Sequence, residues 1–141
     1  PGRWTLAHVV NLGSGGAFFS QHLKDDLKAL VPSAGITDGL GASETGMSGM
    51  AEKSEEGVMR LPANEFQQVV VDNRIGTIGE TGFIARTGNT PVGYYGDPVK
   101  TAETFVTIDG KLWAVSGDAG RLDEDSEGLL LLTNDPKMNA V

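Results

Sequence analysis

The hydrophobic pattern at the start of the chain predicts a strand followed by a helix. Residues 7–12 are mostly apolar and read as a buried strand, which leads into the glycine-rich segment 13–16, where sharp bends cost little. Ser20 is a good N-cap for a helix whose apolar residues recur at helical spacing, at Leu23, Leu27 and Leu30. One face of this helix is therefore expected to be apolar.

A second short strand is expected at residues 36–40, which completes a strand-helix-strand unit with a glycine loop after each strand. Residues 47–62 combine Gly, Ser, Met and charged residues without a clean period, so this stretch predicts a loop. The organisation predicted from these patterns is an α/β subdomain at 1–46, a connection at 47–64 and a β-subdomain at 65–141.

The second half of the chain predicts a small β-sheet or barrel. Short extended candidates separated by Gly, Asp and Asn turns occur at 66–71, 82–86, 112–115 and 129–132. Asp97 and Pro98 supply an N-cap and a first-turn proline, so a brief helix is expected over 99–105. The fold class is therefore α/β: the strand-helix-strand end of an α/β subdomain, followed by a small, mostly antiparallel, β-barrel-like subdomain.

Composition narrows the partners of the chain. Its 141 residues suit one compact domain, and a formal net charge of −8 has the wrong sign for a surface that follows nucleic acid phosphates. Cysteine is absent, which rules out disulfides and thiolate chemistry and fits a reducing compartment, so a cytoplasmic location is expected. Apolar runs such as 129–132 are far shorter than a membrane-spanning helix, and no transmembrane segment is predicted. The chain begins with Pro1 and has no initiator methionine, which predicts a processed chain or a piece of a longer one.

Three motifs follow one another in a set order. Gly15, Gly16 and Ala17 precede the predicted helix, and residues 38–46 read DGLGASETG. Downstream come GETGFI at 79–84, GYY at 93–95, TAETF at 101–105, Trp113 and SGD at 116–118. Together they resemble the AMP-forming acyl-CoA synthetases of the adenylate-forming superfamily, and most closely the fatty-acyl-CoA ligases. Leu40 stands where the family has an aromatic residue.

The resemblance implies ATP, Mg²⁺ and coenzyme A as cofactors and a small-molecule carboxylate as substrate. It implies that two residues of one loop are catalytic. Glu44 would contact the metal, and Ser43 would donate a hydrogen bond to a phosphate. It also implies a nucleotide-binding set consisting of Gly15, Gly16, Ala17, Asp38, Gly39, Leu40, Gly41, Ser43, Thr45 and Asp118. Within this set, Asp118 matches the aspartate that holds the ribose.

The residues by themselves leave local interpretations open. Ser43 suits a turn hydroxyl as well as a phosphate donor, and Asp118 suits an ordinary Gly-Asp turn as well as a ribose contact. Without the ordered set of motifs around it, Glu44 would be interpreted as an ordinary solvated loop residue. Mg²⁺ in proteins nevertheless takes only one or two carboxylates and leaves its other positions to water and phosphate, so one glutamate suffices.

Two family elements are expected elsewhere: an upstream phosphate loop with its lysine, and a C-terminal domain with a catalytic lysine. The chain is therefore expected to be an internal fragment of an acid-thiol ligase, inactive alone, whose partners include the missing subdomains of the parent enzyme. Apolar surface that those subdomains would cover is expected to be exposed. The alternative is a non-catalytic nucleotide-binding or interaction module derived from the same fold.

Overall fold

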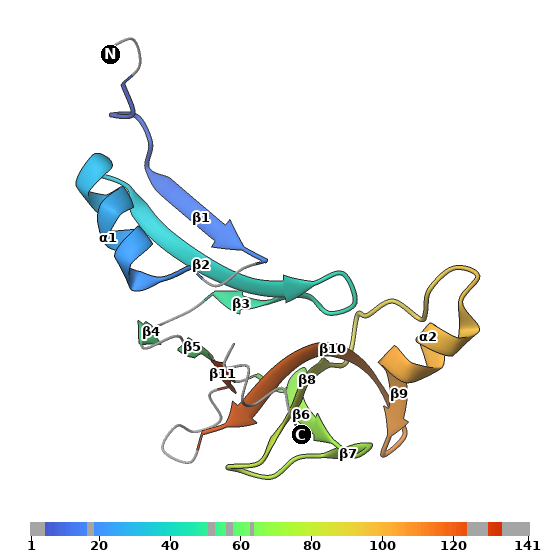
Figure 1. Ribbon diagram of the computed structural model, residues 1–141. Helices are drawn as coiled ribbons and strands as arrows, with labels where there is room; N and C mark the ends of the chain where they lie inside the picture. The colour runs from blue at the N-terminus through green and yellow to red at the C-terminus, as the bar shows by residue number, and fades with distance from the viewer. Residues whose placement is uncertain are drawn as a thin grey trace.

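A computed structural model describes residues 5–16, 19–50, 53–55, 58–62, 64–123 and 130–133. The elements run β1 (Asn11–Gly15), α1 (Gln21–Leu30), β2 (Gly35–Ala42), β3 (Gly46–Met50), β4 (Lys53–Glu55), β5 (Val58–Leu61), β6 (Gln67–Val71), β7 (Arg74–Ile75), β8 (Thr81–Arg86), α2 (Pro98–Thr104), β9 (Phe105–Ile108), β10 (Lys111–Leu122) and β11 (Leu130–Thr133). These elements form a small α/β unit standing on a β-barrel-like unit (Figure 1).

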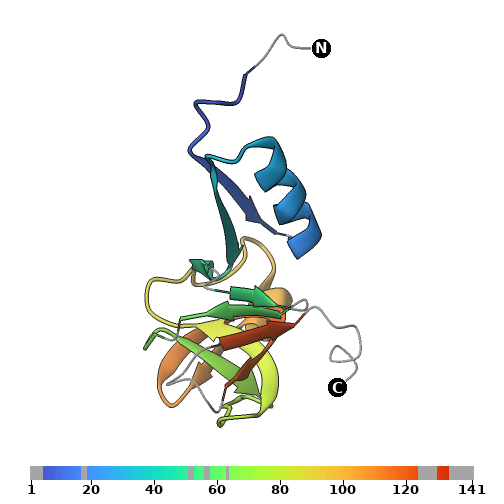
Figure 2. The same ribbon diagram turned by 90° about the vertical axis from the view of Figure 1, so that its left-hand side faces the viewer.

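The α/β unit is a 3-stranded sheet in the order β1-β2-β3, with α1 on one side of it (Figure 2). β1 and β2 are parallel, as expected for strands joined through a helix, and β3 returns antiparallel to β2. The Ser20 side chain accepts a hydrogen bond from the Leu23 amide, so the predicted N-cap is confirmed.

The first strand lies later in the chain than the pattern predicted. Residues 7–12 were expected to form it, but 7 and 8 are in a turn and β1 runs through the glycine segment. The reason is pairing, because Gly13 and Gly15 of β1 lie opposite Thr37 and Gly39 of β2 and are held extended by that ladder.

The stretch 47–62, predicted as a loop, contains most of β3 and all of β4 and β5. β3 pairs with β2, β4 pairs with β5, and β5 pairs with β11. This prediction was wrong because strand pairing supplies the backbone hydrogen bonds, whatever the local hydrophobic period. β2 with β3 and β4 with β5 are neighbours along the chain, whereas β5 with β11 is a long-range pair.

The β-unit is an 8-stranded antiparallel sheet ordered β4-β5-β11-β10-β8-β6-β7, with β9 also paired to β10. It curls into the nearly closed, barrel-like shape seen in Figure 1. All four predicted strands occur, although β10 is much longer than the predicted 112–115. The predicted brief helix is α2, capped by Asp97, and Phe105 already begins β9. The predicted fold class is confirmed.

The core of the β-unit has two clusters, because neighbouring residues of a strand point to opposite faces of the sheet. Val69 packs in one cluster and the adjacent Val70 in the other, which includes Trp113. The α/β unit lacks a comparable core in the part of the chain that is described. α1 has no buried residue, and Leu23 and Leu30 keep 50% and 73% of their surface exposed, which confirms the expected exposed apolar face.

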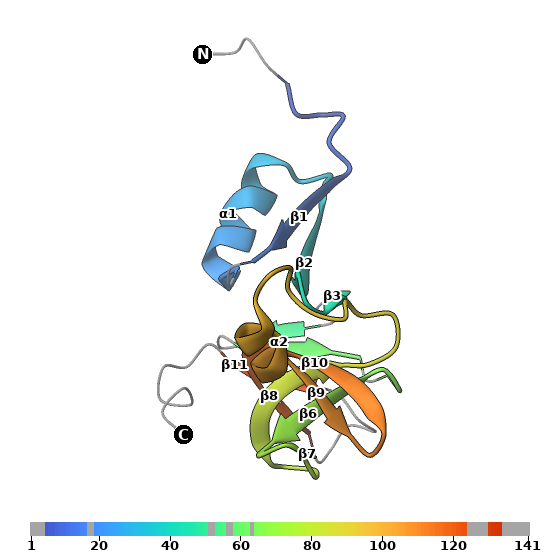
Figure 3. The ribbon, with the colours of Figure 1, turned by 90° about the vertical axis from the view of Figure 1, so that its right-hand side faces the viewer.

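Side-chain hydrogen bonds join the two units. The buried Gln67 of β6 donates from Nε2 to the Ser48 carbonyl of β3 over 2.6 Å, and Arg86 of β8 donates to the Met47 carbonyl over 2.7 Å. These bonds fix β3 against the barrel, and Figure 3 shows α2 at the end of the barrel nearest to β2 and β3. Most of the predicted site residues that the structure describes meet at this junction. α1 and α2, with 10 and 7 residues, are the helices of the described part of the chain, and neither meets the length and apolarity that a membrane span requires.

Candidate nucleotide site

Two pockets lie at the junction of the α/β unit and the barrel. The first, of ≈ 520 Å³, is lined by residues 13–16, 39–43, 46, 47 and 50, and we call it the glycine pocket. The second, of ≈ 490 Å³, is lined by Ala42, Glu44, Phe83, Tyr94, Lys100, Glu103, Thr104, Val115, Ser116, Gly117 and Asp118, and we call it the acidic cleft. Ala42 lines both pockets, so they are neighbours.

The glycine pocket brings together two of the segments singled out in the sequence. Gly15 and Gly16 come from the end of β1, and four more predicted site residues come from β2 and the turn after it: Gly39, Leu40, Gly41 and Ser43. The parallel pairing of Gly15 with Gly39 is what places these segments side by side. Ala17 lies outside the described residues.

The turn between β2 and β3 depends on a close backbone approach. A Cβ added to Gly41 would lie 2.7 Å from the Gly46 carbonyl oxygen, so a larger residue cannot stand there without moving the turn. The β2–β3 register also shifts between Leu40 and Gly41. This tight turn is what presents Ser43 to the glycine pocket and Glu44 to the acidic cleft.

Two predicted residues face neither pocket. Asp38 is buried in β2, and its Oδ2 lies 3.2 Å from Lys24 Nζ of α1, so its side chain joins strand to helix. Asp38 was predicted to belong to the nucleotide-binding set, but its neighbours Gly39 and Leu40 line the glycine pocket instead. Thr45 is buried too, and its hydroxyl contacts the Ser48 hydroxyl at 3.5 Å. Both side chains have structural contacts, as alternation along a strand and a tight turn dictate.

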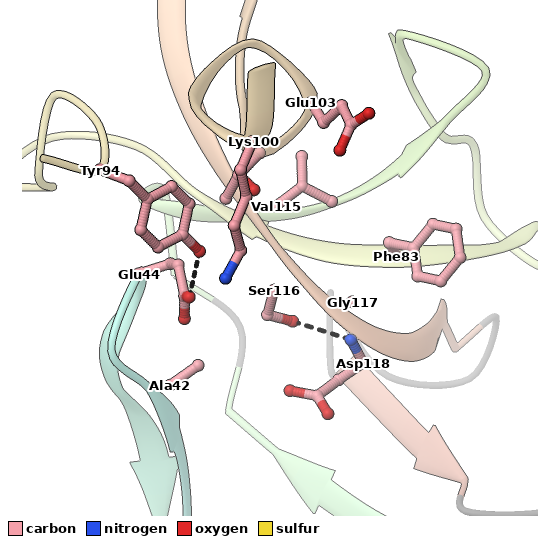
Figure 4. A pocket seen from close by; sticks show the side chains of 11 residues that line it. Ala42, Glu44, Phe83, Tyr94, Lys100, Glu103, Val115, Ser116, Gly117 and Asp118 are labelled. Atoms are coloured by element: carbon pink, nitrogen blue, oxygen red, sulfur yellow. Dashed lines mark hydrogen bonds between the residues drawn. The ribbon is translucent and has the colours of Figure 1, made fainter. Parts of the chain in front are cut away.

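Glu44 is oriented by a residue from the other unit. The Tyr94 hydroxyl donates a hydrogen bond to Glu44 Oε1 (Figure 4). This bond lowers the pKa of the Glu44 carboxyl below its ordinary value of 4.5; its own backbone amide and the Lys100 charge act in the same direction, against partial burial. Glu44 is therefore an ionised carboxylate near neutral pH.

Tyr94 is itself held in place. Its backbone N–H donates to Thr101 Oγ1 over 2.9 Å, and its ring meets Phe105 edge to face with centroids 5.7 Å apart. Both partners belong to the segment of α2 and β9, so α2 carries one wall of the acidic cleft.

Asp118 reaches the cleft because β10 is irregular there. The register between β10 and β8 shifts between Val115 and Ala119, and Gly117 has φ 73°, a conformation that glycine adopts without strain. The Asp118 N–H donates to Ser116 Oγ over 3.1 Å and closes this bulge. Glu44 and Asp118, which come from different units, both line this cleft (Figure 4).

Of the lining residues that the motifs did not assign to the site, Tyr94 and Lys100 are the ones that act on Glu44. Both lie in segments that carried the resemblance or adjoin it, but only the fold brings their side chains against Glu44. The Asp97 cap was the one local signal, because it starts the helix that holds Lys100.

The described side chains limit which metal ion the site could hold. Among the residues that the structure describes, no three His, Asp or Glu side chains gather into a ready-made metal site. A single ionised carboxylate, Glu44, does fit Mg²⁺ that arrives with phosphate and water as its other ligands. The described side chains do not fit a structural metal ion whose ligands all come from the protein.

The chain shares its fold with adenylation domains of solved structure. No family model matches the chain. The chain shares 27% identity and a TM-score of 0.61 with the N-terminal subdomain of Klebsiella oxytoca NpsA, solved with 3-hydroxyanthranilyl-AMSN, over 86% of this chain and 33% of that one. A long-chain-fatty-acid-CoA ligase from Archaeoglobus fulgidus has the same fold, with a TM-score of 0.64 at 19% identity over 88% of this chain and 28% of that one.

The curated relatives that the chain resembles in sequence are acyl-CoA ligases. The chain is 38% identical over 136 residues to the medium/long-chain-fatty-acid–CoA/3-oxocholest-4-en-26-oate–CoA ligase of Mycobacterium tuberculosis (strain ATCC 25618 / H37Rv), covering 91% of this chain and 25% of that protein. It is 35% identical to the 3-oxocholest-4-en-26-oate–CoA ligase of Rhodococcus rhodochrous, over 91% of this chain and 24% of that protein. The resemblance to AMP-forming acyl-CoA synthetases is confirmed, and the chain spans about a quarter of the length of these relatives.

Proposed function

We propose that this chain forms the nucleotide-facing part of an ATP-dependent acid-thiol ligase. In that reaction a carboxylate, of the fatty-acid class, attacks the α-phosphorus of ATP, which gives acyl-AMP and releases pyrophosphate. The thiol of coenzyme A then takes the acyl group and AMP leaves. The observation that carries the proposal is the meeting of Glu44 and Asp118, from two different units, in one cleft beside the glycine pocket.

Each side chain has a role in this proposal. The adenine lies between the glycine segment of β1 and the β2 wall that includes Leu40, where absent side chains let a flat ring approach the backbone. Asp118 accepts hydrogen bonds from the two ribose hydroxyls, as a carboxylate can. Ser43 donates to a phosphate oxygen, and Glu44 is the one carboxylate that would hold Mg²⁺. Bound magnesium supplies charge neutralisation at the phosphates.

The roles leave Asp38 and Thr45 without a ligand contact, because their side chains are buried in structural contacts. The proposal keeps the predicted division of the chain into an α/β subdomain at 1–46, a connection at 47–64 and a β-subdomain at 65–141. The connection carries most of β3 and all of β4 and β5. Substrate binding then occurs between subdomains, where ligand pockets in proteins are common.

The proposal is tested by nucleotide binding to the chain itself. Calorimetric titration with AMP, and with ATP in the presence and absence of Mg²⁺, would be compared for wild type, Asp118→Asn and Glu44→Gln. Asp118→Asn should weaken both nucleotides by about 1.5–3 kcal/mol, the range for a lost hydrogen bond to a charged group. Glu44→Gln should weaken ATP only when Mg²⁺ is present.

A matched control is Asp109→Asn, which makes the same chemical change in the turn between β9 and β10, outside the cleft. Its nucleotide affinities should equal those of wild type. Equal loss in the Asp109 and Asp118 variants, or no nucleotide binding by the wild-type chain, would count against the proposed site.

A further inference from the structure

Among the described residues that line the acidic cleft, Lys100 is the one cation. It projects from α2, and its ammonium lies 4.2 Å from the centroid of the Tyr94 ring. A cation held over an aromatic face is attracted by the ring, so this contact restrains the long side chain. Figure 4 shows the side chain reaching into the cleft alongside Tyr94.

Among the described residues, no ion pair neutralises the charge of Lys100. In the described part of the chain, the salt bridges join other partners, and no carboxylate lies within ion-pair distance of Lys100. Its charge nonetheless acts on Glu44 across the cleft. The ammonium is therefore oriented into the cleft and keeps its donors available for a ligand.

The charge balance of the cleft makes this cation important for an anionic ligand. The lining holds three carboxylates, Glu44, Glu103 and Asp118, against one ammonium, which is a formal charge of −2. Such a lining repels a polyphosphate unless positive charge is supplied at the phosphates. A metal ion beside Glu44 supplies part of it, and Lys100 is the protein group placed to supply the rest.

We propose that Lys100 is a phosphate-contacting residue of this cleft, oriented by the face of Tyr94. A lysine ammonium is a compact point charge that suits phosphate oxygens without demanding one planar geometry. The inference rests on the proposed function and deepens it, because it adds a positively charged side chain to Ser43 at the phosphate end of the nucleotide.

The test compares wild type with Lys100→Ala, Lys100→Arg and the control Lys111→Ala, whose residue is exposed in β10 and lies outside the cleft. Four probes are titrated: adenosine, AMP, ATP with Mg²⁺, and inorganic pyrophosphate with Mg²⁺. Lys100→Ala should weaken ATP and pyrophosphate by about tenfold or more, as loss of a charged hydrogen bond would, and should change adenosine less than about twofold. Lys100→Arg should restore most of the loss, and Lys111→Ala should match wild type.

The four probes separate the possible results. If Lys100→Ala weakens binding of ATP but not of pyrophosphate, Lys100 contacts the phosphates only when the adenosine part is also bound. If it weakens binding of both, Lys100 is a general polyphosphate contact. Either result supports the inference. Unchanged ATP affinity in Lys100→Ala, or an equal loss of adenosine affinity, overturns it while leaving the proposed function in place. No binding of any nucleotide by wild type instead overturns the proposed function, and the inference falls with it.

Discussion

Removal of the hydroxyl group by Tyr94→Phe should destabilise the chain by a definite, pH-dependent amount. The hydroxyl donates to an ionised carboxylate, Glu44, and a charged hydrogen bond contributes about 1.5–3 kcal/mol when fully buried. Both side chains are only partly buried, so solvent screening should reduce the effect to about 1 kcal/mol. The phenyl ring keeps the contacts with Phe105 and Lys100, which isolates the hydroxyl.

The assay is a double-mutant cycle of Tyr94→Phe and Glu44→Gln, read from urea unfolding by circular dichroism. A coupling free energy of about 1 kcal/mol is expected at pH 7. The sign of the pH dependence follows from the lowered pKa of Glu44: the stabilisation is complete above about pH 4.5, where the unfolded carboxyl is ionised, and is lost as pH falls through the lower folded pKa.

The neighbouring Tyr95 provides a matched control, since its side chain is fully exposed, and Tyr95→Phe should leave the free energy of unfolding unchanged. Additive single-variant effects at pH 7 would refute the reasoning. So would a coupling that persists well below the folded pKa, because the protonated carboxyl no longer offers a charged acceptor.

Three further predictions concern the turn, the junction and the reaction. Gly41→Ala should cost about 1–3 kcal/mol in thermal unfolding, since its Cβ would meet the Gly46 carbonyl at 2.7 Å; an unchanged melting temperature would show that the turn relaxes freely. Gln67→Leu should cost about 1–3 kcal/mol because it leaves the Ser48 carbonyl without its buried donor, and Gln68→Leu on the same strand is the comparison. The chain alone should form no acyl-CoA from ATP, Mg²⁺, fatty acid and coenzyme A, because it spans about a quarter of the related ligases; steady product formation measured by chromatography would contradict this.

The local sequence determined those features that depend only on residues close together in the chain. Ser20 and Asp97 cap their helices as predicted, because a cap satisfies amides within the same turn. The short apolar runs of the second half are strands, as their spacing between turn residues indicated. The ordered motifs also identified the relatives, since that identification needs residue types in order and no coordinates.

Only the tertiary structure decided which of those residues meet. The glycine segment became a strand because β2 pairs with it. The supposed loop at 47–62 supplied strands because β3 pairs with β2, β4 with β5, and β5 with the distant β11. Asp38 turned toward α1, whereas Asp118 was carried into the cleft by a shift of register in β10. Tyr94 and Lys100 joined Glu44 through contacts between two units, and no local pattern along the chain encodes a meeting of side chains so far apart in sequence.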